Sequence, residues 1–420
     1  MKRVGFRQVS LAAIVIGCAS GPAFAGGFYA PYQSATANAT AIAGATAGTG
    51  DPSGLFFNPA SNASLQGHQI YVDAKVFIPD LTLNAAAATT PNTTFNQPLP
   101  PNSVSDLAGE AFAPNVYASY SINERLKLGF AFYSPFAAKI DAEDPTWSGR
   151  YQLTKTDITT YSGTLSLAYQ LTETLAVGGG VTVEYFDGKF ERTEIGPGGF
   201  DYTGFLEGDD VEVGFSAGLI WKPHDGTTIG LAYRSQMDHD FNGSAGLRDV
   251  VAYGAQYDLT MPQIVSLGIR QKLHSGWTLL GEIEWQDFST FTGFDIALAP
   301  PSPVSRDVRP QSWDDSWIFA IGAEYRPDEK NTWRFGIQYD TAVSDGGGNT
   351  LSPDADRIMV GLGYERQVSD RFKWSAFYAH VFYDDAAINV TPSATNTQGT
   401  LIGSMETDLD MFGVSGTFTW

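Results

Sequence analysis

The C-terminal segment, residues 408–420, constrains the fold more strongly than any other part of the chain. Phe412, Val414, Phe418 and Trp420 alternate with small or hydroxylic residues, so one face of an extended segment is apolar and aromatic. A strand of a membrane β-barrel has this arrangement, because one face meets lipid, the other faces a polar lumen, and aromatic residues lie at the membrane interface. For this segment alone, an edge strand of a soluble β-sandwich is the alternative.

The N-terminus predicts export from the cytoplasm. A positively charged start is followed by an apolar run at residues 9–19 and by an Ala-Phe-Ala sequence that ends at Ala25. We therefore predict a secretory signal peptide over residues 1–25, since the apolar run is too short to cross a membrane as a helix. Alternatively, the Val-Ile-Gly-Cys sequence that ends at Cys18 resembles a lipoprotein processing box, which would leave a lipidated cysteine as the first residue.

The composition favours a membrane barrel and excludes several kinds of chemistry. Cys18 is the single cysteine, so a chain cleaved after Ala25 has no disulfide, no thiol catalysis and no cysteine-ligated metal. Aromatic residues make up 13% and charged residues only 17%, against about 25% in soluble domains. Beyond the leader, no apolar run reaches the roughly 18 residues of a membrane helix.

The formal net charge of −21 argues against a nucleic-acid partner, because phosphates would be repelled. Solvated acidic loops explain this charge most simply, and bridging by divalent cations to anionic lipopolysaccharide is the alternative.

Strand-like segments recur from residue 69 onward and predict an all-β transmembrane barrel of about 14 antiparallel strands, an even number as in single-chain bacterial barrels. In one of them, Trp317, Phe319 and Ile321 share an apolar face. Short turns alternate with long connections rich in Pro, Gly and Asp, as expected for periplasmic turns and extracellular loops. Residues 372–383 alternate poorly. The predicted strands are 69–78, 112–122, 126–140, 150–171, 174–192, 210–223, 226–238, 262–273, 276–288, 314–327, 330–341, 356–368, 371–383 and 407–420.

Residues 26–66 differ from the rest of the mature chain. They are rich in Ala, Thr, Gly and Asn and carry a Leu-Phe-Phe sequence at 55–57, which is unusual for a flexible linker. Small residues allow close packing in a confined space. We therefore predict that residues 26–66 form a compact plug and that the barrel spans residues 67–420.

The N-terminal motifs resemble those of the FadL/TodX family of outer-membrane transporters for hydrophobic compounds. The resemblance implies a barrel in the Gram-negative outer membrane that imports long-chain fatty acids or aromatic hydrocarbons, with the motif residues in the plug and the inner ligand site. These residues are Gly26, Gly27, Phe28, Phe56, Phe57, Asn58, Pro59 and Ala60. The C-terminal residues Phe412, Val414, Phe418 and Trp420 also resemble the signal that the barrel-assembly machinery reads. The expected partners are thus a hydrophobic ligand, outer-membrane lipid and lipopolysaccharide, and that machinery.

The third predicted strand contains Pro135, which cannot donate a hydrogen bond to a neighbouring strand. A closed barrel has no edge strand to accommodate it, so the strand must bulge or kink there. A local bulge is one interpretation. The family resemblance implies the other, a lateral opening through which an apolar cargo enters the membrane without crossing water. The residues of this predicted opening are Tyr133, Ser134, Pro135 and Phe136.

A fatty-acid cargo would need a cation in the lumen to bind its carboxylate, and Arg150, Lys155 and Arg192 are the candidates on nearby strands. Such residues are also common as solvated charges at a barrel rim. A neutral aromatic or alkane cargo would need no cation, and the sequence leaves this choice open.

No enzymatic activity, metal or cofactor is expected. The five histidines have no metal-site spacing, and the chain contains no G-x-S-x-G motif. The sequence favours gated passive diffusion with lateral exit through the kinked third strand. A general diffusion porin or a structural outer-membrane protein would share the barrel pattern, but neither explains the plug and Pro135.

Overall fold

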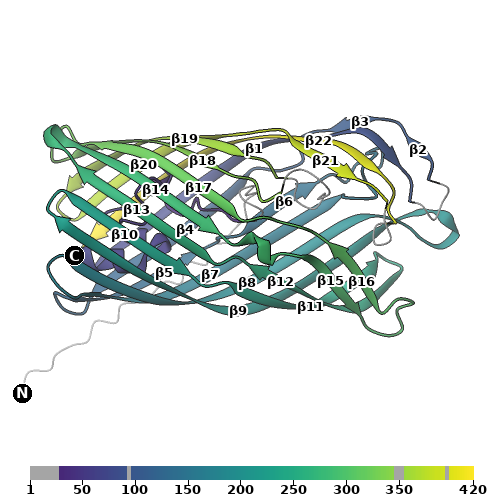
Figure 1. Ribbon diagram of the computed structural model, residues 1–420, viewed down its shortest axis with the longest axis horizontal. Coiled ribbons are helices and arrows are strands. Elements are labelled where there is room, and N and C mark those ends of the chain that lie inside the picture. The colour runs from purple at the N-terminus through teal and green to yellow at the C-terminus, as the bar shows by residue number, and fades with distance from the viewer. Residues whose placement is uncertain (1–27, 92–95, 345–353, 393–396) are drawn as a thin grey trace, which may run out of the picture.

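The computed structural model describes residues 28–91, 96–344, 354–392 and 397–420. Fourteen antiparallel strands close into one barrel, in which the last strand pairs with the first from Gln69↔Thr419 to Ala88↔Leu401 (Figure 1). This confirms the predicted all-β barrel and its strand number. The predicted signal peptide, including Cys18, and the motif residues Gly26 and Gly27 lie outside the described residues.

Six barrel strands are divided into two segments by short irregular stretches. In order around the barrel, the strands are β1 (Gln69–Thr89), β4 (Ala111–Ser121), β5 (Leu126–Tyr133) with β6 (Ala137–Asp141), β7 (Lys155–Gln170), β8 (Leu175–Ile195), β9 (Asp201–His224), β10 (Thr227–Arg234) with β11 (Met237–Leu247), β12 (Val251–Met261) with β13 (Ile264–Lys272), β14 (Trp277–Gln286) with β15 (Gly293–Leu298), β16 (Arg306–Pro310) with β17 (Ser316–Tyr325), β18 (Asn331–Asp340), β19 (Arg357–Ser369), β20 (Phe372–Tyr383) with β21 (Ala386–Val390), and β22 (Leu401–Thr419).

The connections at the two ends of the barrel differ in length (Figure 1). One end has short turns, including the 3-10 turn η4 (His274–Gly276). The other has long hairpins, the 3-10 turn η3 (Pro197–Gly199), and the short strands β2 (Pro98–Leu99) and β3 (Asn102–Val104), which pair with β1. No helix in the described ranges is long and apolar enough to cross a membrane.

The strands separate an apolar outer face from a mixed inner face. Val181, Ile321 and Val414 are 54%, 67% and 58% exposed on the outer face. Glu184, on the same strand as Val181, and Ser415, next to Val414, point to the opposite face and are buried inside the barrel. Outward exposure of aliphatic side chains suits a surface surrounded by lipid. The alternation predicted for the membrane part of the strands is confirmed.

The extracellular ends of several strands were predicted wrongly. β1 continues to Thr89 where a loop was expected from residue 79, β11 and β12 occupy the supposed loop at 239–261, and residues 150–154 form a turn before β7 instead of its beginning. Beyond the membrane both faces of a strand meet water or other loops, so the alternation disappears while the backbone pairing continues.

The poor alternation of residues 372–383 also has a physical cause. Phe377, Ala379 and Val381 of β20 face inward and share an apolar cluster with Ala35 of α1 (Ala35–Asn38) and with Ala39, so the inner face of this strand is apolar as well.

Residues from Phe28 to Ser64 lie inside the barrel, near the end with the short turns (Figure 1). They form α1, α2 (Gly54–Phe57) and the 3-10 helix η1 (Pro59–Ser64). Inward-facing glycines allow this backbone to approach the wall closely: a Cβ atom at Gly336 would lie 1.8 Å from the Thr40 carbonyl oxygen, and one at Gly230 would lie 2.0 Å from that of Thr46.

The Asn-Pro-Ala sequence fixes part of this inner segment to the wall. The Asn58 side-chain amide donates to the carbonyls of Thr46 (2.9 Å) and Leu219 of β9 (3.1 Å), and its oxygen accepts the Ala60 N–H (2.9 Å) at the start of η1. One side chain thus satisfies a helix terminus and two backbone carbonyls in a confined space.

Candidate functional site

The third barrel strand is interrupted at Pro135. β5 ends at Tyr133 and β6 begins at Ala137, and β6 pairs with β7 alone. Residues 111–115 of β4 pair with β1 but have no partner on the side of the third strand. The hydrogen-bonded wall therefore has a gap between β4 and β6.

Leu107 bounds this gap on the side of the long loops. Its N–H donates to the carbonyl of Leu81 (3.4 Å), and its carbonyl accepts the Asp141 N–H (2.7 Å). The loop before β4 thus joins β1 to the end of β6.

The beginning of the described chain fills the gap from inside. The Ala30 N–H donates to the Pro135 carbonyl (2.8 Å), and the Ala137 N–H donates to the Phe28 carbonyl (3.0 Å). Tyr29 and Phe136 form an isolated antiparallel bridge between these two bonds. The interrupted strand therefore gains a short partner that is not part of the wall.

Gln33 joins both sides of the gap. Its side-chain amide donates to the Ser134 carbonyl (2.6 Å), while its own backbone carbonyl accepts from Asn115 Nδ2 (2.6 Å) and the Tyr117 hydroxyl (2.8 Å) of β4. Residues 28–33 thus bridge the break with hydrogen bonds that involve side chains as well as backbone.

Phe28 packs in a chamber of aromatic rings. Its ring centroid lies 5.2 Å from that of Trp313 and 6.4 Å from that of Phe291. Trp313 comes from the stretch between β16 and β17, whereas Phe291 follows the 3-10 turn η5 (Phe288–Thr290) between β14 and β15. Interruptions of neighbouring strands therefore place these inward-facing rings.

Phe56 and Phe57 lie on the other side of the inner segment. Phe56 makes edge-to-face contacts with Phe57 and with Tyr133, each at 4.9 Å between centroids. Arg234 of β10 stacks on the Phe56 ring at 4.2 Å and donates to the Phe56 carbonyl (2.7 Å). A small internal cavity of about 20 Å³ lies next to these groups and is also lined by Tyr29.

The three cations expected to bind a carboxylate are all paired with acidic side chains. Arg150 contacts Asp201 and Lys155 contacts Glu143, each at 3.2 Å, and neither cation lines a described pocket. Arg192 contacts Glu194 at 2.6 Å and does line a pocket.

Sequence reasoning missed Arg234, the lumen cation closest to the motif residues. A pattern could have found it: Ile229, Leu231 and Tyr233 alternate along β10, so Arg234 falls on the opposite, inward face.

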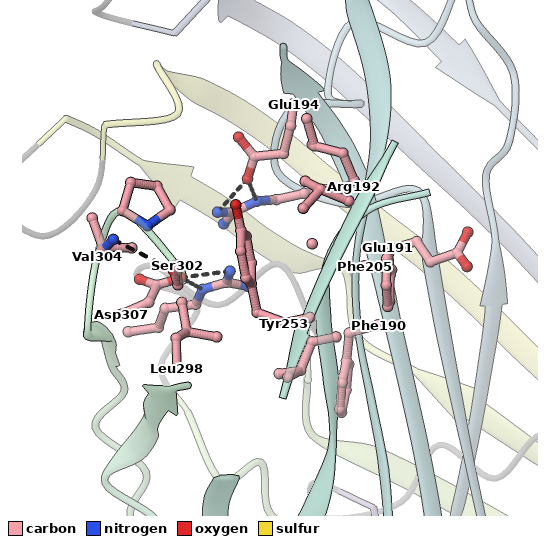
Figure 2. Close-up of a pocket in the computed structure, with 18 of the residues that line it drawn as sticks. Phe190, Glu191, Arg192, Glu194, Phe205, Tyr253, Leu298, Ser302, Val304 and Asp307 are labelled. Carbon is pink, nitrogen blue, oxygen red and sulfur yellow. Dashed lines mark hydrogen bonds and ion pairs between the residues drawn. The ribbon is translucent and has the colours of Figure 1, made fainter. Parts of the chain in front are cut away.

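An outer pocket of about 420 Å³ lies among the long hairpins (Figure 2). β8, β9, β11 and β15 supply most of its apolar wall, including Phe205 and Leu206. Leu99 and Val104, from the neighbouring outer strands β2 and β3, belong to a separate apolar cluster, and Phe200 is exposed.

The charged groups of the outer pocket neutralise one another. Arg192 pairs with Glu194, and Arg309 pairs with Asp307 at 2.8 Å (Figure 2). Burial lowers the pKa of Arg309, and the nearby Arg192 lowers this pKa further. Burial would raise the pKa of Asp307, but the Arg309 guanidinium brings it below its usual range. The remaining surface of the pocket is mainly apolar.

Successive aromatic rings connect the outer pocket with the interrupted strand. The centroids of the contacting rings along this path lie 4.4–5.6 Å apart. At one step, from Phe28 to Tyr29, the path instead continues between consecutive residues of the chain. The rings of this aromatic path are, in order, Phe190, Phe294, Phe291, Trp313, Phe28, Tyr29 and Phe136.

The predicted assembly residues Phe412, Val414, Phe418 and Trp420 are all exposed on the outer face. Trp420 also closes the barrel seam, since its N–H donates to the His68 carbonyl (3.0 Å) and its carbonyl accepts the His68 N–H (3.1 Å). In the described part of the chain, no three His, Cys, Asp or Glu side chains are placed to hold a metal ion.

Comparisons with known proteins agree with this architecture. Residues 16–420 match the family model described as outer membrane protein transport protein (OMPP1/FadL/TodX). A long-chain fatty acid transport protein of Escherichia coli O6:H1 is 23% identical, over 93% of this chain and 91% of the relative. Among solved structures, a Pseudomonas aeruginosa FadL homologue has a TM-score of 0.84 at 21% identity, over 94% of this chain and 99% of that one. The Pseudomonas putida toluene transporter TodX has a TM-score of 0.68 at 15% identity, over 92% and 98% of the two chains.

Proposed function

Since this chain belongs to the OMPP1/FadL/TodX family of outer membrane transport proteins, we propose that it imports a hydrophobic small molecule by gated passive diffusion. In this proposal the cargo enters at the outer pocket, follows the aromatic path, and leaves sideways through the gap at Ser134, Pro135 and Phe136. Residues 26–66 act as the plug that blocks straight passage.

The observation that carries the proposal is that the aromatic path ends at the gap. An apolar molecule that moves from ring to ring and then into lipid never exposes its surface to water. The transfer avoided is worth about 0.8 kcal/mol per CH₂ group. A water-filled channel would offer no such advantage to an apolar cargo.

The N-terminal segment is the proposed gate. Residues 28–33 lie across the gap and also supply Phe28 and Tyr29 to the path, so cargo at these rings competes with the contacts that hold the segment. Each of its hydrogen bonds contributes only about 0.5–1.5 kcal/mol net, so a ligand can displace it.

A general diffusion porin is the main alternative, and a structural role is another. The close contact between the inner segment and wall glycines such as Gly336 argues against an open pore. The pairing of charged groups in the outer pocket argues against a site for hydrated solutes.

A reversible tether tests the exit route. Tyr29 and Phe136 are antiparallel bridge partners, so Tyr29→Cys with Phe136→Cys brings two thiols within disulfide range. Ser375→Cys with Ser415→Cys is the matched control, because these residues are also cross-strand partners but lie within the wall. Both substitutions of the first variant also remove rings of the aromatic path, so its reduced form is the reference for uptake. We expect oxidation to lower uptake of a labelled hydrophobic compound below this reference and reduction to restore it, with no such change in the control variant.

Equal uptake by the oxidised and reduced forms of the first variant would contradict lateral exit. If cells with the unmodified chain take up no more labelled fatty acid or toluene than cells without it, the transport proposal itself fails.

A further inference from the structure

The barrel wall has another interruption, between β9 and the seventh strand. The pairing of β9 with β10 stops at Ser216, and its pairing with β11 starts only at Asp209. Residues 210–215 of β9 therefore have no paired residue on the seventh strand, although every residue on both sides is described. The facing stretch, residues 235–241, is one residue longer, so the side chains of the seventh strand change face there.

Side chains replace part of the missing ladder. The Ser235 N–H donates to the Phe215 carbonyl, and the Phe215 N–H donates to the Ser235 hydroxyl, each at 2.9 Å. At the other end of the interruption, the Asp240 N–H donates to the Asp210 carboxylate (3.3 Å). This closure therefore depends on side chains, as the closure beside Pro135 depends on Gln33.

His239 of β11 joins three strands on the inner side of the interruption. Its Nδ1 lies 3.1 Å from the Asp210 carboxylate of β9, and its Nε2 lies 3.4 Å from the Glu184 carboxylate of β8. Glu184 also accepts from the Ser162 hydroxyl (2.5 Å). The side chains of His239 and Glu184 are fully buried. Buried polar groups of this kind satisfy one another only while the strands stay together.

A branch of the aromatic path leads to this imidazole. Phe294 belongs to the path, and its ring centroid lies 5.9 Å from that of Tyr257. Tyr257 stacks on Phe241 at 4.7 Å, and Phe241 lies 5.8 Å from the His239 ring. Tyr257 and Phe241 are buried inside the barrel. The aromatic rings therefore connect the outer pocket with this interruption as well as with the gap at Pro135.

The outer side of the interruption lies at the boundary between lipid and water. Val211 and Val213 of β9 are exposed on the apolar outer face, whereas Asp238 of β11 is exposed and charged. Met237 packs into the wall here, since a Cβ atom at Gly214 would lie 2.9 Å from the Met237 sulfur. A methionine side chain is flexible and can move aside. Backbone groups without partners are costly next to lipid, so an interruption at this depth calls for an explanation.

We infer that the interruption between β9 and β11 is a second lateral opening, through which apolar cargo passes between the aromatic path and the outer leaflet. His239 is its latch, because release of the contact with Asp210 frees β11 from β9 on the inner side. The contacts that close it do not include residues 28–33, so it is controlled separately from the gate at Pro135. This inference rests on the proposed transport function and adds a route to it.

Spin labels test whether the strands separate. Val211→Cys with Asp240→Cys places two labels across the interruption, because these exposed residues would pair next if the β9–β11 ladder continued. The matched control is Val183→Cys with Val213→Cys, an exposed pair within the continuous β8–β9 ladder. The protein is studied in lipid nanodiscs by electron paramagnetic resonance. We expect weaker dipolar coupling across the interruption than in the control.

Removal of the latch should increase this difference. His239→Ala should weaken the coupling across the interruption further and leave that of the control pair unchanged. If His239→Ala does not fold, His239→Gln takes its place, since a neutral amide cannot bind both carboxylates as strongly. Equal coupling in the two pairs, unaffected by substitution of His239, would overturn the inference.

Cross-linking of the same pairs tests whether cargo uses the opening. A short bifunctional thiol reagent should cause a partial loss of uptake of a labelled hydrophobic compound in the Val211→Cys, Asp240→Cys variant and none in the control. The loss is partial because the gap at Pro135 stays available. Unchanged uptake would overturn the role of the interruption as a cargo route. Absence of uptake by the unmodified chain would instead refute the transport proposal, and the spin-label result does not depend on it.

Discussion

A single methyl group added at Gly336 should expel part of the inner segment from the barrel. Gly336 lies on β18, and a Cβ atom there would stand 1.8 Å from the carbonyl oxygen of Thr40 and 2.1 Å from its carbonyl carbon. An ordinary contact begins at 3.4 Å. The backbone at Thr40 must therefore retreat by about 1.6 Å, because the obstacle is main chain and cannot rotate away.

The turn at Thr40 cannot make this movement without losing contacts. The Thr40 carbonyl accepts the Ala43 N–H (3.0 Å), and the Thr40 hydroxyl donates to the Ala37 carbonyl (3.0 Å). Overpacking of this kind typically costs about 1–3 kcal/mol. That range changes the ratio of docked to undocked segment by about 5- to 150-fold.

The expected result for Gly336→Ala is a folded barrel with a loosened plug. The electrophoretic mobility of the unheated protein should stay that of a folded barrel, while limited proteolysis should cut the N-terminal segment faster than in the parent. Ion conductance in planar bilayers should rise because the lumen is no longer filled. Gly163→Ala is the matched control, since nothing lies within 4 Å of a Cβ atom at that glycine of β7.

Identical proteolysis and conductance for Gly336→Ala and Gly163→Ala would refute the reasoning. Gly230→Ala provides a repeat at a second site, where a Cβ atom would lie 2.0 Å from the Thr46 carbonyl oxygen. If the two inward variants lose the folded barrel altogether, proteolysis of the parent and of the control still measures how firmly the segment is docked.

Three further predictions address other parts of the molecule. Asn58→Ala should speed proteolysis of the inner segment, because three hydrogen bonds of about 1 kcal/mol each are lost, and Asn58→Asp should be at least as severe, because a carboxylate oxygen would then face the carbonyl oxygens of Thr46 and Leu219. Phe294→Ala should slow uptake of a labelled hydrophobic compound by breaking the aromatic path, whereas Phe319→Ala on the lipid face should not. Trp420→Ala should reduce the amount of folded barrel in the outer membrane, measured by gel mobility, and Trp420→Phe should retain most of it.

The membrane half of the barrel was predictable because lipid and lumen impose different chemistry on the two faces of each strand. Trp317, Phe319 and Ile321 alternate for this reason, and their exposure agrees with it. The extracellular half carries no such constraint. β11 and β12 therefore looked like a loop, although they pair continuously from Met237↔Met261 to Leu247↔Val251.

The aromatic chamber could not be derived from the sequence. Phe291 and Trp313 come from two irregular stretches that the pattern assigned to one long loop, and nothing in either stretch shows that both rings turn inward toward Phe28. Such convergence depends on how neighbouring strands pair beyond the interruptions. Arg234 was not among the predicted lumen cations for a related reason: those were taken from strands near the third one, whereas Arg234, which contacts Phe56, lies on the seventh.

The interruption at Pro135 and the inner segment form one structural unit, although the sequence presents them as separate features. Pro135 removes a donor from the third strand, and the carbonyl left on that strand accepts the Ala30 N–H. Gln33 then holds Ser134 on one side and Asn115 on the other. Any movement that opens the gap must therefore move the same residues that place Phe28 in the aromatic chamber. We therefore expect occupation of the chamber by cargo and opening of the wall to be coupled through this segment, so that a ligand that displaces Phe28 also weakens the closure beside Pro135.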